Sequence, residues 1–342
     1  MANRILAYGT REETYDILGN HAIDTGGGDS AYSDSSMRIQ ASTSNSLSYM
    51  LFKDESGALD PAIAGERLFC HGRLNSTSAN TNPAFIGMVL SDGALPLLAI
   101  MGSGTSSVLR LCYNSAATGN TPTWVSLGNL TGFVGSTHNT VDVFIDIGVD
   151  GHHKATAVVG AGETIVAEFD QPRLTKIDRF GIGCPTPEIS FAYWTEMTAA
   201  VGISLIGARI KTIRPNAAGT YAEFTTNAIG NVNEVVNNDA TYDRSAAAGQ
   251  RQSYNMTDVT VPATHRIGSV KTIARVQNDG TSPNNVKQIQ RVSGQEFTTP
   301  NYAGIGPTLT NFTIRKELSP VTNQPWTQTE VNSLEVGYQS AA

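Results

Sequence analysis

The sequence predicts an all-β protein made of two antiparallel β-sandwich domains and closed by one short C-terminal helix. Only 15% of its 342 residues are charged, and Gly, Ser, Thr, Asn and Ala are abundant. This composition is typical of β-rich proteins, whose strands favour Val, Ile, Thr and Tyr. Short apolar runs recur about every 8–12 residues between turn signals, which is the spacing of a sandwich or barrel.

The first 30 residues are predicted to be a lead-in or docking segment. Residues 26–29 read Gly-Gly-Gly-Asp and close this segment with a flexible turn. The glycine run does not stand between a strand and a helix, so it does not fit a phosphate-binding loop. We therefore expect the segment to precede the first folded domain.

The first domain is predicted to span residues 31–214. Its expected strands are the apolar runs at 37–41, 48–52, 66–74, 84–90, 96–101, 108–113, 123–127, 165–169, 177–183 and 203–213, with a hairpin over 141–159. The stretch 214–219 is polar and contains Pro and Gly. Domain boundaries fall in such segments, so we place the boundary there.

The hairpin shows the clearest period-two alternation, with apolar residues at every second position from Val141 to Val149. A two-residue turn at Asp150-Gly151 would pair Ile147 with Lys154 on the buried face. A three-residue connection, residues 150–152, pairs Ile147 with Ala155 instead. The apolar pattern favours this second register, because a slip of one residue moves every side chain to the other face.

The second domain is predicted to span residues 215–342. Its expected strands are 221–224, 232–236, 253–256, 268–276, 286–292 and 311–318, which suit a small antiparallel sandwich. Thr327 and Glu330 have the spacing of a capping box, which predicts a helix over about 328–336. We expect Trp326 to fix this helix onto the sandwich.

Charge and cysteine content exclude several function classes. The formal charge of −7, without a basic block, argues against direct nucleic-acid binding. The three cysteines, Cys70, Cys112 and Cys184, are far apart and form no C-x-x-C pair, so neither a zinc knuckle nor a redox motif is expected. No apolar run of about 18 residues is present, so no membrane insertion is expected.

One pair of carboxylates is a candidate for catalysis. Glu168 and Asp170 have the spacing of an acid pair on one strand face, as glycan hydrolysis requires. Pro172 and Arg173 follow where a third acid would stand, so a solvated strand end is the favoured interpretation. His152 and His153 are adjacent in the sequence and would point to opposite faces of a strand, so they do not suggest a shared metal.

No cofactor is expected, and calcium is the one alternative left open. Its candidate ligands are Asp142, Asp146 and Asp150, which lack the Asp-x-Asp-x-Asp-Gly pattern of a calcium loop. Aromatic side chains near strand ends are candidates for stacking on sugar rings. They are Tyr113, Trp124, Tyr193 and Trp194.

The C-terminal segment from Ser319 to Tyr338 resembles a closing element of tailed-bacteriophage virion proteins: a Pro/Asn turn, then Trp-Thr, then a short helix ending Glu-Val-Gly. The resemblance is tight over about 20 residues and extends loosely over the last 120 or so. It implies a structural protein located in the virion, with other virion proteins as partners and a homo-oligomeric state.

The first domain resembles the concanavalin-A-like lectin/glucanase jelly roll, including laminin-G-type sandwiches. The likeness rests on the hairpin ending Gly-Val-Asp-Gly-His-His at 148–153, on Phe169-Asp-Gln, and on Asp178-Arg-Phe-Gly-Ile-Gly. One fold can host many functions, so three alternatives remain open. They are a non-enzymatic structural protein, which we favour, an adhesin that binds cell-surface glycans, and a glycan hydrolase.

Overall fold

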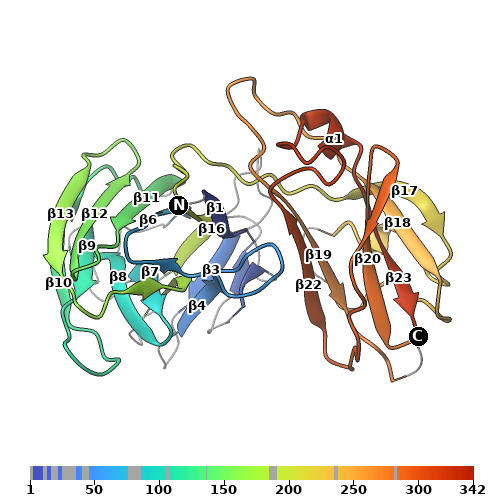
Figure 1. The fold of residues 1–342 in the computed structure, drawn as a ribbon, viewed down its shortest axis with the longest axis horizontal. Coiled ribbons are helices and arrows are strands. Elements are labelled where there is room, and N and C mark those ends of the chain that lie inside the picture. The colour runs from blue at the N-terminus through green and yellow to red at the C-terminus, as the bar shows by residue number, and fades with distance from the viewer. Residues whose placement is uncertain are drawn as a thin grey trace. The chain divides into compact units, whose positions relative to one another are not determined.

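The computed structural model describes residues 3–10, 14–16, 22–24, 36–40, 46–75, 86–104, 108–135, 137–184, 191–234, 238–280 and 283–342 (Figure 1). The chain divides into two compact units, unit 1 (Met1–Ile210) and unit 2 (Lys211–Ala342). This division lies a few residues before the boundary expected after residue 214. Each unit consists of antiparallel strands, and the predicted all-β class with a single short α-helix is confirmed for the described residues.

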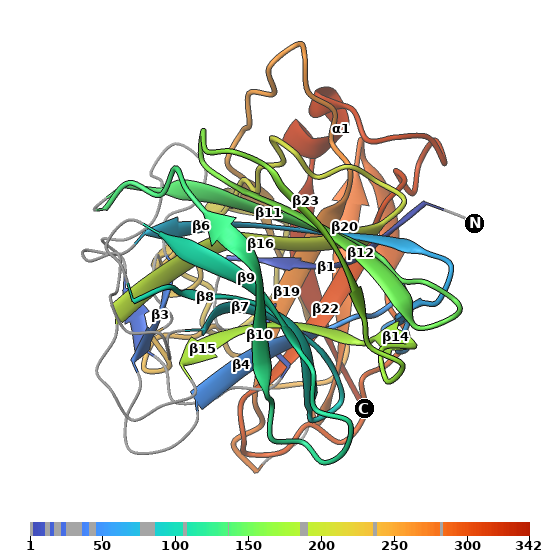
Figure 2. The same cartoon turned by 90° about the vertical axis from the view of Figure 1, so that its left-hand side faces the viewer.

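Unit 1 is a sandwich of two large sheets. The eight-stranded sheet has the order β13-β12-β11-β6-β16-β3-β2, and β1 pairs with β16 alongside this path (Figure 2). Its strands are β1 (Arg4–Gly9), β2 (Ala22–Asp24), β3 (Ser36–Gln40), β6 (Arg67–Asn75), β11 (Asn139–Asp146), β12 (His152–Val159), β13 (Ile165–Asp170) and β16 (Phe191–Val201). Met197–Val201 of β16 pairs with β1, and Phe191–Trp194 pairs with β3.

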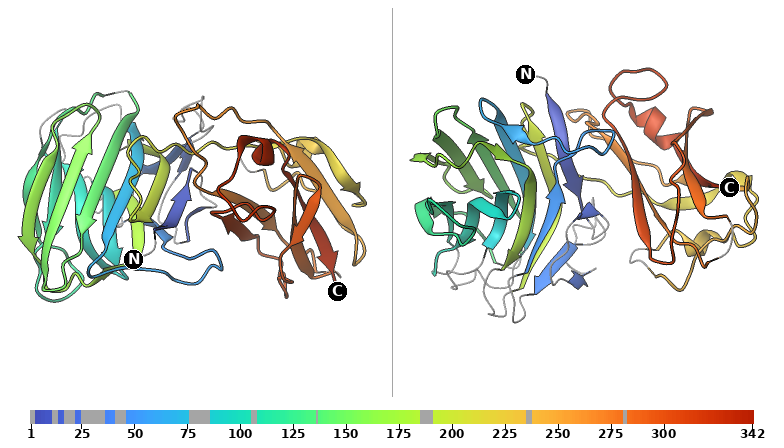
Figure 3. Two further views of the ribbon diagram at one scale, coloured as in Figure 1. Left: turned by 45° about the horizontal axis from the view of Figure 1, so that its top comes forward. Right: turned by 60° about the horizontal axis from the view of Figure 1, so that its bottom comes forward.

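The second layer of unit 1 is a six-stranded sheet with the order β10-β9-β8-β7-β15-β4. Its strands are β4 (Ser46–Leu51), β7 (Ile86–Asp92), β8 (Leu95–Gly102), β9 (Leu109–Asn114), β10 (Trp124–Leu130) and β15 (Arg179–Cys184). A further pair, β5 (Ala62–Ile63) with β14 (Lys176–Ile177), forms a separate two-stranded ribbon. Figure 3 shows the two large sheets of unit 1 lying face to face.

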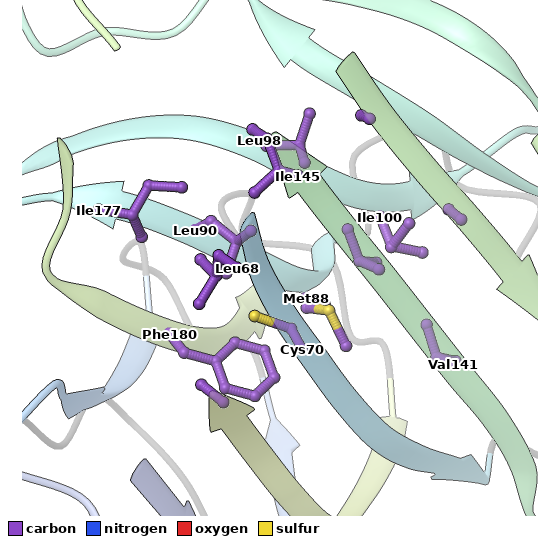
Figure 4. Packing of buried hydrophobic residues seen from close by; sticks show 14 of the residues in the cluster. Leu68, Cys70, Met88, Leu90, Leu98, Ile100, Val141, Ile145, Ile177 and Phe180 are labelled. Atoms are coloured by element: carbon purple, nitrogen blue, oxygen red, sulfur yellow. The ribbon is translucent and has the colours of Figure 1, made fainter. Parts of the chain in front are cut away.

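The core of unit 1 fills the space between the two sheets. Alternate residues of each strand point inward, as the period of two requires. Leu68 of β6 lies opposite Ile145 of β11, Cys70 and Val141 belong to the same cluster, and all four are fully buried (Figure 4). Burying a large apolar side chain contributes about 1.5–3 kcal/mol, so this cluster is the main source of stability in unit 1.

Three predictions about unit 1 are wrong. Residues 4–9 are not part of a separate lead-in, because β1 pairs with β16 inside the large sheet. Residues 203–213 do not form a strand, and the strand is β16, just before them. The hairpin pairs Ile145 with Ala155, so both registers considered from the sequence are incorrect. The buried face was chosen correctly, because the observed register differs from the favoured one by two residues.

Unit 2 packs a five-stranded sheet against a two-stranded ribbon. The sheet order is β17-β18-β23-β20-β21, and the ribbon is β19-β22. The strands are β17 (Pro215–Ala222), β18 (Arg251–Met256), β19 (Val270–Val276), β20 (Asn285–Val292), β21 (Gln295–Thr298), β22 (Thr310–Lys316) and β23 (Glu335–Ala341). The amide of Gln290 donates to the Thr272 hydroxyl at 2.9 Å, and that of Gln288 donates to the Phe312 carbonyl at 2.8 Å. Polar side chains therefore join the two layers.

The C-terminal element of unit 2 contains the capping box expected from the sequence. Thr327 is the N-cap of α1 (Gln328–Asn332), and its hydroxyl accepts from the Glu330 amide at 3.2 Å. The Glu330 carboxylate accepts in return from the Thr327 amide at 2.9 Å. Trp326 is 4% exposed, and its indole N–H donates to the carbonyl of Lys316 at 3.0 Å. The tryptophan thus ties the helix start to β22.

The helix is shorter than predicted, and a strand follows it. It ends at Asn332, whereas 328–336 was expected. Residues 335–341 form β23, the central strand of the five-stranded sheet. The expected strand at 232–236 is also absent from its described part, where a 3₁₀ turn (Ile229–Asn231) ends just before it.

Candidate functional site

The outer face of the eight-stranded sheet, which points away from the core of unit 1, brings together polar groups from six strands. Cross-strand partners lie on the same face. The register therefore arranges side chains in rows that cross the sheet. The polar row contains Val158, Asp142, His71, Thr198 and Tyr8. The apolar row beside it contains Val166, Thr156, Phe144, Phe69, Ala200 and Ile5. The charged row contains Glu168, Lys154, Asp146 and Arg67.

The polar row contains a buried imidazole and carboxylate. Nδ1 of His71 lies 2.8 Å from Oδ1 of Asp142, and the His71 side chain has no exposed surface. Nε2 of His71 has no hydrogen-bond partner among the described atoms. A carboxylate that orients one ring nitrogen and leaves the other unbonded is the arrangement of a general base. A base must also reach its substrate, and complete burial prevents this here.

Glu196 occupies a strained position beside this pair. It lies where the register of β16 against β6 shifts, and its φ of 55° is in the left-handed region. Such a conformation costs a non-glycine residue about 1–3 kcal/mol. Arg209 compensates for this cost with two charge-assisted hydrogen bonds to the fully buried carboxylate, at 2.6 and 2.9 Å. The strain therefore serves to anchor the segment that carries Arg209.

This segment, residues 202–210, covers one end of the outer face. Leu205 is 5% exposed and packs with Ile5 and Ala200 at the β1–β16 end of the apolar row. Residues 203–213 were expected to form a strand. They are irregular instead, and apolar residues among them, such as Leu205, pack on the sheet. This end of the sheet is closed, and the β13 end remains accessible.

The accessible end carries aromatic and charged side chains. The half-buried ring of Phe144 lies 4.9 Å, between centroids, from that of Phe69, which itself packs against the cluster at the closed end, and the two rings are tilted by 58°. Val166 continues the same row and is 56% exposed. At the sheet edge, Nδ1 of His152 is 2.7 Å from Asp170, and its Nε2 is 3.5 Å from Glu168. Asp170 and then Glu168 raise the pKa of this exposed imidazole.

The structure separates the proposed calcium ligands. Asp142 faces His71, and Asp146 binds Arg67 with Oδ2 at 2.8 Å from Nη2. Asp150 lies in the turn, where it accepts from the His152 amide at 3.1 Å. Residues four apart in a strand are about 13 Å apart, too far to share one ion. In the described ranges, no group of three or more His, Cys, Asp or Glu side chains is arranged to hold a metal ion.

The aromatic candidates do not form one surface. Trp194 is 1% exposed in the main core, so it cannot stack on a sugar. Tyr113 also packs against that core, and its ring centroid is 4.8 Å from that of Phe169. Trp124 is half-buried against a separate cluster that includes Cys112. The side chain of Tyr193 lies outside the described part of the chain.

Sequence reasoning missed a second polar network, on the outer face of the five-stranded sheet in unit 2. Glu335 is 7% exposed, and its carboxylate accepts from the hydroxyls of Ser253 and Thr220 and from Arg291, the last at 2.8 Å. Burial alone would raise the pKa of Glu335, but these donors together lower it. The close approach of residues 219–221 requires Gly219, because a Cβ there would lie 2.5 Å from Oε1 of Glu335.

No protein-family model matches the chain, and no curated protein matches it. Within the part of unit 2 that the structure describes, Glu335, Arg291 and Ser253 come from three neighbouring strands, β23, β20 and β18. The alternation of residues 335–341 could have indicated strand β23, but the helix predicted over about 328–336 included its first residues.

Solved structures with similar folds include lectins and enzymes that act on carbohydrates. Endo-β-1,4-glucuronan lyase from the fungus Trichoderma reesei has 15% identity and a TM-score of 0.40, over 58% of this chain and 95% of that chain. The carbohydrate esterase of the Shiga toxin-encoding bacteriophage phi24B has 10% identity and a TM-score of 0.38, over 59% and 100%. Arcelin-5, a lectin-like defence protein of Phaseolus vulgaris, has 7% identity and a TM-score of 0.37, over 59% and 98%. Similarities this low carry no argument about activity.

Proposed function

We propose that this chain is a non-enzymatic structural protein that acts through protein–protein contacts, as a component of a tailed-bacteriophage virion. The observation that carries the proposal is that every buried acidic side chain in the described residues binds a hydrogen-bond donor within its own unit. The pairs are Glu66 with Arg4, Asp142 with His71, Asp178 with Arg179, Glu196 with Arg209, Glu330 with Ser319 and Glu335 with Arg291.

This pattern favours a structural role for the acids. A catalytic carboxylate is held so that it can meet a substrate, and one of a catalytic pair usually has a raised pKa. Here the pKa values of Glu66 and Glu330 are instead lowered, chiefly by the side-chain hydrogen bonds from Arg4 and Ser319. Stabilised carboxylates of this kind hold loops and strands together, which suits a protein whose work is assembly.

The exposed pair Glu168 and Asp170 fits the same interpretation. Both side chains project from the edge strand β13, with exposures of 61% and 84%, and both face the His152 ring. Glycoside hydrolysis needs two carboxylates that flank a bound sugar. A pair bridged by one imidazole on an open edge lacks that arrangement.

The virion assignment comes from the resemblance of the C-terminal segment to closing elements of phage virion proteins. The structure adds that this segment is part of the folded unit, because Trp326 and Val331 belong to the apolar cluster of unit 2. This packing accords with a folded particle component. In the described residues no helix is long and apolar enough to cross a membrane.

The experiment that tests the proposal compares wild type with the double variant Glu168→Gln/Asp170→Asn. We expect neither protein to release sugars from a panel of bacterial surface glycans, and both to be incorporated into particles at equal levels, measured by quantitative mass spectrometry. Hydrolysis by the wild type that the double variant loses would overturn the proposal. Absence of the protein from purified particles would refute the virion assignment alone.

A second candidate function, glycan binding by an adhesin, is favoured by the apolar row next to the charged row. Phe144, Val166 and Lys154 together offer an apolar strip bordered by charge, as a sugar-binding face requires. A glycan array with the full chain, with and without calcium, tests this alternative. Binding that Phe144→Ala abolishes and Trp124→Ala leaves unchanged would support it, and no binding by the wild type would exclude it.

A further inference from the structure

The edge of the eight-stranded sheet formed by β13 is regular and unpaired. β13 is the last strand in the sheet order and pairs with β12 over six consecutive residues without a register shift. Val166, Glu168 and Asp170 project from it with large exposed fractions. An unpaired edge of this kind is a template for another strand, and natural proteins usually block it with charged side chains, above all Lys, with Pro or with a bulge. β13 contains neither Lys, Pro nor a bulge, and its two charged residues, Glu168 and Asp170, are both acidic.

The hydrogen-bond pattern shows which backbone groups face the open edge. The amide of Gln171 donates to the carbonyl of Gly151 at 2.9 Å, so odd-numbered residues of this strand direct their backbone groups toward β12. Backbone groups alternate in direction along a strand. Those of Val166, Glu168 and Asp170 therefore point away from the sheet, where the described part of the chain provides no strand to pair with them.

The other sheet edges are protected, which makes β13 distinctive among the described strands. β1, β10 and β17 contain register shifts, β2 has three residues, β5 and β14 have two each, and β21 has four. The edge of β4 is occupied, because Asp16 accepts from the Leu51 amide and donates its own amide to the Tyr49 carbonyl. The ribbon strands β19 and β22 contain Lys and Arg residues.

We propose that β13 pairs antiparallel with β13 of a second copy of this chain, with Ala167 on the twofold axis. This inference rests on the proposed function and names one of its protein contacts. Because even-numbered residues carry the free backbone groups, Val166 forms a hydrogen-bonded pair with the partner's Glu168. Ala167 then faces the partner's Ala167 as a non-hydrogen-bonded pair. A twofold contact of this type uses the same surface on both copies.

Side-chain chemistry selects this register over its neighbours. On the inner face, half-buried Ile165 meets the partner's Phe169, which joins two apolar residues. A register shifted by two residues in one direction would place Glu168 opposite the partner's Glu168, and like charges directly opposite each other are destabilising. The opposite shift shortens the overlap beyond the start of β13. The chosen register alone combines long overlap with the absence of like-charge pairs.

The first test uses a matched pair of charge variants at Val166, which is 56% exposed in the single chain. V166E places a carboxylate opposite the partner's Glu168 at two symmetric positions, and V166K places an ammonium there. We expect V166E to raise the dimer dissociation constant about 2- to 30-fold. V166K should leave that constant unchanged or lower it. Sedimentation velocity of the full chain over a micromolar concentration series measures both.

The second test identifies the register with single cysteine variants. Non-hydrogen-bonded antiparallel pairs have Cα atoms about 4.5 Å apart, within the range of about 4.4–6.8 Å that a disulfide spans. A167C should therefore form a disulfide-linked dimer under mild oxidation. V166C and E168C should not, because neither position faces itself. The wild-type chain is the control for cross-links through the native thiols. Two of these, Cys70 and Cys112, are buried.

Each outcome has one meaning. Dimerisation of wild type with cross-linking through A167C supports the inference. Cross-linking through V166C or E168C instead, or equal weakening by V166E and V166K, would overturn the pairing described here. A wild-type chain that stays monomeric at every concentration also overturns it. The proposed function would survive such a result if the same monomeric chain still entered particles, so the two failures are distinguishable.

Discussion

The substitution Glu335→Ala tests whether the polar network of unit 2 stabilises the fold. It would remove the close ion-pair partner of Arg291, whose side chain is only 19% exposed, and leave it the longer contact of 4.0 Å to Glu296. It would also remove the acceptor of Thr220 and Ser253. Breaking a buried ion pair by removing one partner costs about 3–5 kcal/mol. Because Arg291 keeps some contact with water, we expect a loss of about 3 kcal/mol in the free energy of unfolding of unit 2.

The control for this substitution is Glu296→Ala. Glu296 binds Arg251 on the same face of the sheet, but its side chain is 30% exposed. Exposed ion pairs contribute about 0–1 kcal/mol, so the loss should stay below about 1 kcal/mol. Glu335→Gln should fall between the two variants, because the amide oxygen still accepts from Ser253 while the charge that pairs with Arg291 is lost.

Urea denaturation followed by tryptophan emission measures these losses. Trp326 is the one tryptophan of unit 2, and the other two of the chain are Trp124 and Trp194. Replacing those two by Phe in every protein, including the reference, makes the signal specific for unit 2. Equal losses for Glu335→Ala and Glu296→Ala would refute the argument that burial gives this network its strength.

Three further predictions concern the cap, the core and pH. Thr327→Ala should destabilise unit 2 by about 1 kcal/mol, whereas Thr329→Ala, at an exposed helix position, should have little effect in the same urea assay. Trp194→Ala should cost unit 1 about 3–5 kcal/mol, and Trp124→Ala clearly less, as measured by thermal unfolding. Burial raises the pKa of Asp243 from 3.8 to about 6, so unit 2 should lose stability as the pH rises through this interval, and Asp243→Asn should remove that dependence. A flat pH profile in the wild type would contradict the last prediction.

The strand pattern of this protein could be predicted from the sequence where alternation is strong and local. The runs at 286–292 and 311–318 lie over β20 and β22. The end of the helix could not be predicted, because Glu335-Val-Gly-Tyr fits the end of a helix as well as a strand. Its place in the centre of a sheet depends on β18 and β20, both far away in the sequence. Long-range pairing therefore overrode the local signal.

The outer face of unit 1 shows why a site of this kind cannot be read from alternation. His71 and Asp142 each appear in a predicted strand, but 71 positions separate them in the sequence. Alternation assigns each residue to one of two faces and does not say which strands are neighbours. Asp142 was therefore grouped with Asp146 and Asp150 as a calcium ligand, although its actual partner is on β6.

The distribution of groups over the outer face of the eight-stranded sheet supports the proposed role in protein contacts over a catalytic role. At the β16 end, where strain, a carboxylate and an unpaired imidazole nitrogen come together, residues 202–210 cover the face and Arg209 neutralises Glu196. At the β13 end the face is accessible, and it offers backbone groups and Val166. The reactive groups are therefore closed off and the open groups are those that pair strands. A sheet arranged in this way is suited to extension by another strand.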